Sequence, residues 1–198
     1  MNKTRVISVV NQKGGVGKTT TAVNLSTALA AINKKVLLID LDPQGNLSTG
    51  LGIKSENRKI NVYDLIMVEN ISIEKAYLKT KIPYLDIIPS SINLSGIEFE
   101  LSDDKYRNKK LYNKINMIKN KYDFIIIDCP PSLGILTINS LVASDLILVP
   151  LQCEFYALEG LAQLLKTIEA VKSNLNPNLE LEGIVLTMHD SRNRLAED

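Results

Sequence analysis

Residues 5–20, RVISVVNQKGGVGKTT, decide the fold of this chain. A short apolar run at 5–10 is joined to a helical pattern that starts at Thr19 by a loop with three glycines and two lysines. Glycines let backbone N–H groups turn inward around phosphate oxygens, and the amino end of the following helix adds the positive end of its dipole. A strand, this loop and a helix therefore predict a phosphate-binding loop.

Within this loop, Lys18 is predicted to reach the β and γ phosphates of ATP, and the Thr19 hydroxyl to bind Mg²⁺. The common pattern G-x-x-x-x-G-K-[ST] has glycine where this chain has Gln12, and a second lysine, Lys13, stands five residues before Lys18. The residues that we expect to surround the ATP phosphates are Lys13, Gly14, Gly15, Val16, Gly17, Lys18, Thr19 and Thr20.

The rest of the chain alternates apolar runs with helical patterns. The runs are residues 5–10, 36–39, 85–88, 124–127, 146–149 and 181–186, and the helical patterns are 19–32, 108–120 and 157–171. Nearly continuous runs of this length are typical of strands buried on both faces of a parallel sheet. The order predicts an α/β fold with a doubly wound, mostly parallel sheet flanked by helices, in one P-loop domain over residues 1–198.

Two acidic segments follow predicted strands, where ligands bind in such folds. Asp40 and Asp42, two residues apart, would share one face of an extended segment. We expect Asp40 to hold the magnesium shell and Asp42 to orient the attacking water. Asp128 ends the run 124–127, as in a Walker B motif, and would contact Mg²⁺ through water. The predicted catalytic residues are thus Lys13, Lys18 and Asp42, and the predicted Mg²⁺ residues are Thr19, Asp40 and Asp128.

These motifs together resemble the ParA/MinD family of deviant Walker P-loop ATPases, from Val6 to about Arg194. The string K-G-G-V-G-K-T at 13–19 is similar to the family's deviant Walker A motif, and D-x-D-P-Q-G-N at 40–46 is similar to the switch I motif of partition proteins. The resemblance implies that Lys13 reaches across a homodimer to the phosphates of the partner's ATP. Pro130 and Pro131 would begin the switch II loop.

The resemblance further implies a ParA/Soj-type cycle in chromosome or plasmid partitioning. The ATP-bound homodimer would bind DNA without sequence preference, and a ParB-type protein would stimulate slow hydrolysis and release it. Arg192 and Arg194 are the candidate contacts to DNA phosphates, because that segment resembles the family's DNA-binding face. The protein would be cytoplasmic and associated with the nucleoid.

The overall composition does not indicate a binding partner, so any partner must be recognised by a local feature of the sequence. The net charge of +1 exerts no overall attraction on nucleic acid. We interpret the lysines of 105–121 as the solvated face of a helix rather than a DNA site. Cys129 and Cys153 have no metal-ligand spacing, and no apolar run approaches the ~20 residues of a membrane span.

Three alternatives stay open. A MinD-like, membrane-positioned ATPase would need a C-terminal amphipathic helix, which this sequence does not show. An iron–sulfur carrier ATPase would need a cysteine pair, where only Cys129 and Cys153 occur. An ATP-gated positioning scaffold would hydrolyse negligibly, against which Asp42 argues. The chain ends at Asp198 without a helix stop signal, so we expect the family fold to continue beyond it.

Overall fold

The computed structural model describes residues 3–153 and 157–188. In this part of the chain, seven strands form one sheet in the order β3-β4-β2-β5-β1-β6-β7. Only β3 is antiparallel to its neighbour. The strands are β1 (Arg5–Val9), β2 (Val36–Asp40), β3 (Leu78–Lys79), β4 (Leu85–Ile88), β5 (Phe124–Asp128), β6 (Leu146–Gln152) and β7 (Glu180–Thr187). The predicted doubly wound, mostly parallel sheet is confirmed.

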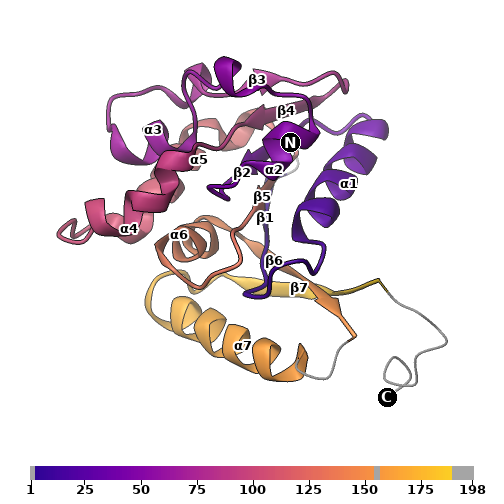
Figure 1. Cartoon of the computed structure of the whole chain (residues 1–198), viewed down its shortest axis with the longest axis vertical. Helices are drawn as coiled ribbons and strands as arrows, with labels where there is room; N and C mark the ends of the chain where they lie inside the picture. The colour runs from indigo at the N-terminus through magenta and orange to yellow at the C-terminus, as the bar shows by residue number, and fades with distance from the viewer. Residues whose placement is uncertain (1–2, 154–156, 189–198) are drawn as a thin grey trace.

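Helices cover both faces of this sheet (Figure 1). On one face, α1 (Lys18–Ala31) and α2 (Asn46–Gly50) pack through an apolar cluster that includes Ala22, Leu47 and Ile126. The opposite face is covered by α3 (Val62–Met67), α4 (Ile97–Glu100), α5 (Lys110–Ile118), α6 (Ile135–Ala143) and α7 (Ala157–Asn174). Alternate residues of one strand enter different clusters, as Val6 and Ile7 of β1 do, because successive side chains of a strand point to opposite faces.

The central strands explain why the polar motifs meet. Every residue of β2 is buried, and so are the last four of β5. Such strands are held from both sides by apolar contacts, each buried aliphatic side chain contributing about 1.5–3 kcal/mol. In register, Asp40 lies beside Asp128, and Val9 lies on the other side of Asp128. The carboxyl ends of β1, β2 and β5 therefore form one edge, where the predicted site residues follow.

The segment 42–60, in which the sequence shows neither an apolar run nor a helical pattern, contains the helix α2 and a short 3₁₀ turn at Ser55–Asn57. The helix is five residues long and follows Gly45, so its sequence carries little periodic signal. Its stability comes from tertiary hydrogen bonds described below. We also did not predict α6. Its buried face includes the polar residues Thr137, Asn139 and Ser140, which interrupt the apolar periodicity that would indicate a helix.

The lysines of 105–121 mostly have partners inside the protein. Lys110 pairs with Asp104 at 2.6 Å, and Lys119 with Asp145 at 3.1 Å. Lys114 is buried and donates to the carbonyl oxygens of residues 68, 69 and 71, which follow α3. These contacts favour a structural role. In the described part of the chain, no helix has the combination of length and hydropathy needed to cross a bilayer.

Candidate functional site

The loop between β1 and α1 has the backbone that its glycines predicted. Gly15 and Gly17 have φ angles of 77° and 85°, in the left-handed region that favours glycine. Gly17 is the residue before the first turn of α1. Around Gly14 and Gly15 there is open space where a side chain would stand. The loop thus presents bare backbone at the amino end of a 14-residue helix, the arrangement that binds phosphate groups.

Neighbouring strands anchor this loop. The Asn11 side chain accepts a hydrogen bond from the Lys13 N–H at 2.9 Å and donates to the Pro150 carbonyl at 2.7 Å. The Thr187 hydroxyl at the end of β7 donates to the Val16 carbonyl at 2.8 Å. The loop is therefore held by β6 and β7 as well as by its own helix. Sequence analysis missed Asn11 and Thr187; both are polar residues at strand ends, which was the available signal.

Lys18 closes the loop on itself. Its Nζ donates to the Lys13 carbonyl at 2.7 Å, and the residue is 7% exposed. Burial lowers the pKa of Lys18, while the nearby carboxylates of Asp128 and Asp42 act in the opposite direction. A phosphate entering the loop would meet this ammonium where little water competes for it.

Asp40 and Asp128 lie side by side in the sheet but differ in their partners. One oxygen of Asp40 accepts hydrogen bonds from the Ser48 N–H at 2.8 Å and the Ser48 hydroxyl at 2.6 Å. Burial raises the pKa of Asp40, and the bonds from Ser48 oppose that rise. Asp40 thus fixes α2 to the end of β2, a role that sequence analysis did not foresee.

Asp128 is 1% exposed, and neither of its oxygens accepts a hydrogen bond of regular geometry from the described residues. Burial raises the pKa of Asp128 to about 7, although the neighbouring Thr19 hydroxyl favours the ionised form. A buried carboxylate without a partner is costly. It is the arrangement expected where a cation or its water shell completes the site.

These side chains fit a hydrated magnesium ion. Mg²⁺ in nucleotide sites keeps several waters and takes one or two protein oxygens together with phosphate oxygens. Asp128 with the adjacent Thr19 hydroxyl meets that requirement. Among the described residues no group of three or more His, Cys, Asp or Glu side chains could hold a metal by itself, so an ion here would depend on the nucleotide phosphates.

Asp42 is half-buried just beyond β2. Its carboxylate accepts a hydrogen bond from the Gln44 N–H at 2.9 Å, and its own N–H donates to Asp40 at 3.4 Å. Asp42 therefore remains accessible beside the buried pair. Of the other predicted residues, Lys13 is exposed on the loop and Thr20 in the first turn of α1, and Arg192 and Arg194 lie outside the described residues.

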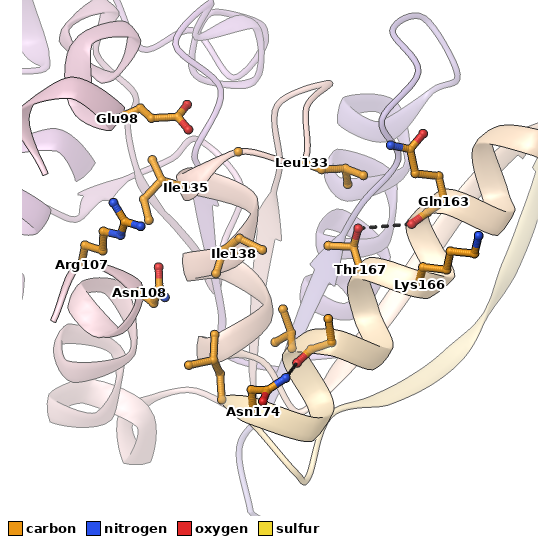
Figure 2. Close-up of a pocket in the computed structure, with 14 residues that line it drawn as sticks. Glu98, Arg107, Asn108, Leu133, Ile135, Ile138, Gln163, Lys166, Thr167 and Asn174 are labelled. Carbon is orange, nitrogen blue, oxygen red and sulfur yellow. Dashed lines mark hydrogen bonds between the residues drawn. The ribbon is translucent and has the colours of Figure 1, made fainter. Parts of the chain in front are cut away.

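A separate hollow of about 640 Å³ lies between α6 and α7 (Figure 2). Leu133, Ile135 and Ile138 line it on one side, and Gln163 and Thr167 of α7 on the other. Its apolar lining contains neither the glycine-rich loop nor the three aspartates. It is therefore distinct from the nucleotide site, although Leu133 and Gly134 belong to the loop that follows Asp128.

The unpartnered Asp128 leads to a stability prediction. Because the pKa of Asp128 is raised, its ionisation destabilises the folded protein as pH rises through about 7. Asp128→Asn should therefore raise the free energy of unfolding of the nucleotide-free protein at pH 8, by about 1–3 kcal/mol, and by less at pH 5. Urea denaturation would measure this change.

The matched control is Asp86→Asn, at another buried aspartate. Asp86 accepts hydrogen bonds from Lys79 Nζ and Tyr122 OH, each at 2.9 Å, so this change should lower the free energy of unfolding. A loss of stability in both variants would show that Asp128 is satisfied in solution.

Comparisons with known proteins show the family to which this chain belongs. Residues 4–181 match a family model described as an AAA domain. The chain is 54% identical to the chromosome partitioning protein ParA of Caulobacter vibrioides over 198 residues, which are 99% of this chain and 74% of that protein. It is 51% identical to the sporulation initiation inhibitor protein Soj of Bacillus subtilis over 192 residues, covering 97% of this chain and 76% of Soj.

A solved structure shares the fold. Cobyrinic acid a,c-diamide synthase from Mycobacterium smegmatis, with bound ATP analogue and magnesium, matches with a TM-score of 0.92 and 39% identity, over 98% of this chain and 79% of the synthase. Sequence identity to the two partition-related proteins is higher, at 54% and 51%.

Proposed function

Because this chain belongs to the ParA/Soj family of P-loop ATPases, we propose that it is a partition ATPase that couples slow ATP hydrolysis to reversible DNA binding. Its cofactors are ATP and Mg²⁺, as for the related P-loop structure that holds an ATP analogue and magnesium. The observation that carries the proposal is the buried Asp128, which accepts no hydrogen bond of regular geometry from the described residues and lies near Thr19 and Lys18.

The hydrolysis step follows from the positions of these side chains. The loop backbone and Lys18 would bind the phosphates and offset their charge, and Thr19 and Asp128 would hold the hydrated Mg²⁺. The ion, when bound, supplies further positive charge at the phosphate oxygens. Asp42 accepts a hydrogen bond from water and orients it toward the γ phosphate. Positioning and charge are the main demands of phosphoryl transfer, so few residues need to act directly on the reacting atoms.

We propose further that the ATP state is a homodimer. Lys13 is exposed at a hollow of about 590 Å³ that also includes Pro131 and Ser132 of the loop after β5 and Glu159 of α7. A second subunit seated there would bring its nucleotide to Lys13. Each Lys13 would then offset charge on the partner's phosphates, so that ATP stabilises the dimer.

DNA binding is the part of this cycle that partition requires most directly. We expect the protein to be retained on a duplex of arbitrary sequence with a non-hydrolysable ATP analogue and Mg²⁺, and not with ADP or without nucleotide. If the dimer uses Arg192 and Arg194 on each subunit, four phosphate contacts make the affinity fall about 100-fold between 50 and 200 mM salt.

Retention on an immobilised duplex, with light scattering to follow the dimer, would measure this. Equal retention in all nucleotide states would contradict the ATP-gated cycle. Dimerisation without any retention would favour a positioning scaffold that acts on another cargo. If the protein is retained with ATP as expected, addition of a ParB-type partner should raise its ATPase rate and release it from the DNA.

A further inference from the structure

Two buried serines connect the aspartates at the end of β2. Ser48 in α2 and Ser90, two residues after β4, are both completely buried. The Ser48 hydroxyl donates to Asp40 at 2.6 Å and accepts a hydrogen bond from the Ser90 N–H at 3.1 Å. The Ser90 hydroxyl in turn donates to the carbonyl of Asp42. The bonds form a closed ring from Asp40 through both serines to Asp42 and back along the chain.

This ring determines where the backbone turns after β2. The Asp42 carbonyl also accepts from the Gly45 N–H at 2.9 Å, which closes the turn that leads into α2. From the outside, Arg58 donates to Thr49 and to the Ile53 carbonyl, each at 2.8 Å. The short helix is thus held on its outer side by Arg58 and on its buried side by Ser90.

We propose that Ser90 and Ser48 are positioning residues, which orient Asp42 for hydrolysis by fixing the backbone that carries it. This inference rests on the proposed ATPase function. The half-buried Asp42 side chain has one bonded neighbour within its own turn, the Gln44 N–H, so its direction depends on the Asp42 backbone. Misplacement of a catalytic group by about 1 Å can reduce a rate about 100-fold. The loss of a single hydrogen bond in this ring should therefore reduce the hydrolysis rate measurably.

The ring also separates catalysis from nucleotide binding. Among the described residues, the hydrogen bonds of Ser90 run to Ser48 and Asp42 and not to the glycine loop or Lys18. Loss of the Ser90 hydroxyl should therefore lower kcat while the dissociation constant for Mg²⁺-ATP stays the same, the pattern of an interaction needed only for the chemical step.

The test compares Ser90→Ala with Ser26→Ala. Ser26 in α1 is equally buried, and its hydroxyl has no hydrogen-bond partner in the described structure, so both variants remove the same atom. Ser90→Ala should reduce kcat about tenfold with less than about a twofold change in nucleotide affinity, and Ser26→Ala should keep the wild-type kcat. Ser90→Cys, which retains a weak donor, should lie between the two and serves if the alanine variant does not fold.

Hydrogen exchange provides a readout that does not need turnover. In Ser90→Ala without nucleotide, amide exchange across residues 42–51 should increase several-fold, while Ser26→Ala leaves that segment unchanged. Unchanged exchange, or a wild-type kcat in Ser90→Ala, overturns the inference. If the wild-type protein hydrolyses no ATP, the proposed function fails, and the exchange measurement still decides whether the serines fix this segment.

Discussion

Lys18→Ala should abolish the binding of Mg²⁺-ATP. Lys18 is 7% exposed, and its Nζ lies on the carbonyl of its own loop. The charges of Asp128 and Asp42 act on Lys18 in the free protein. Without the Lys18 ammonium, nothing would shield the negatively charged triphosphate from these two carboxylates. Both the attraction for phosphate and the shielding of the carboxylates would be lost together.

A thermal shift experiment measures this loss. At a ligand concentration of 100 times Kd, binding stabilises the wild-type protein by about 2.7 kcal/mol, or roughly 5–10 °C in Tm for a domain of this size. Lys18→Ala and Lys18→Met should show no shift at the same concentration, the methionine variant keeping most of the aliphatic packing. Lys172→Ala, at an exposed position of α7, should retain the full shift. A wild-type shift in the Lys18 variants would refute the assignment of the glycine loop as the phosphate site.

The sheet was predictable because its strands are apolar on both faces. A run such as residues 124–127 has no polar alternation, so its length and composition predict a strand buried on both faces of a parallel sheet. The helices α2 and α6 were not predictable in the same way. They are stabilised by polar contacts from distant parts of the chain, such as Ser48 with Asp40 and Asn139 with the Leu111 N–H at 3.2 Å, which no local pattern contains.

The same distinction applies to the site. The sequence indicated Lys18, Asp40 and Asp128 because a glycine-rich loop and the ends of parallel strands place phosphate-binding and Mg²⁺-binding residues at the same edge of the sheet. It could not indicate that Asp40 accepts two hydrogen bonds from Ser48, while neither oxygen of Asp128 accepts one of regular geometry from the described residues. That difference depends on α2 folding back onto β2, and it now gives the two carboxylates separate roles. The Ser90 contact likewise joins residues 48 positions apart in the chain.

Asp42→Ala should retain ATP binding and the DNA-bound dimer but lose about 100-fold in hydrolysis rate, the loss expected when the attacking water is no longer positioned. Asp42 is half-buried, and among the described residues its carboxylate is bonded within its own turn, to Gln44, so its removal leaves the phosphate loop and Asp128 intact. Phosphate release and retention on DNA, measured on the same sample with ATP, would show a protein trapped in its ATP state.

Lys13→Gln is the complementary variant. Comparison with it distinguishes a protein trapped in its ATP-bound, DNA-bound state from one that has simply lost activity. We expect it to bind ATP, since Lys18 and the loop glycines remain, but to stay monomeric and to be washed from DNA. Both variants should be inactive, but only Asp42→Ala should be retained on DNA. This result would show that Lys13 is needed to form the dimer and that Asp42 is needed only afterwards, for hydrolysis. If Asp42→Ala were instead released from DNA as readily as Lys13→Gln, Asp42 would be required to form the ATP state, and its assignment to the attacking water would be wrong.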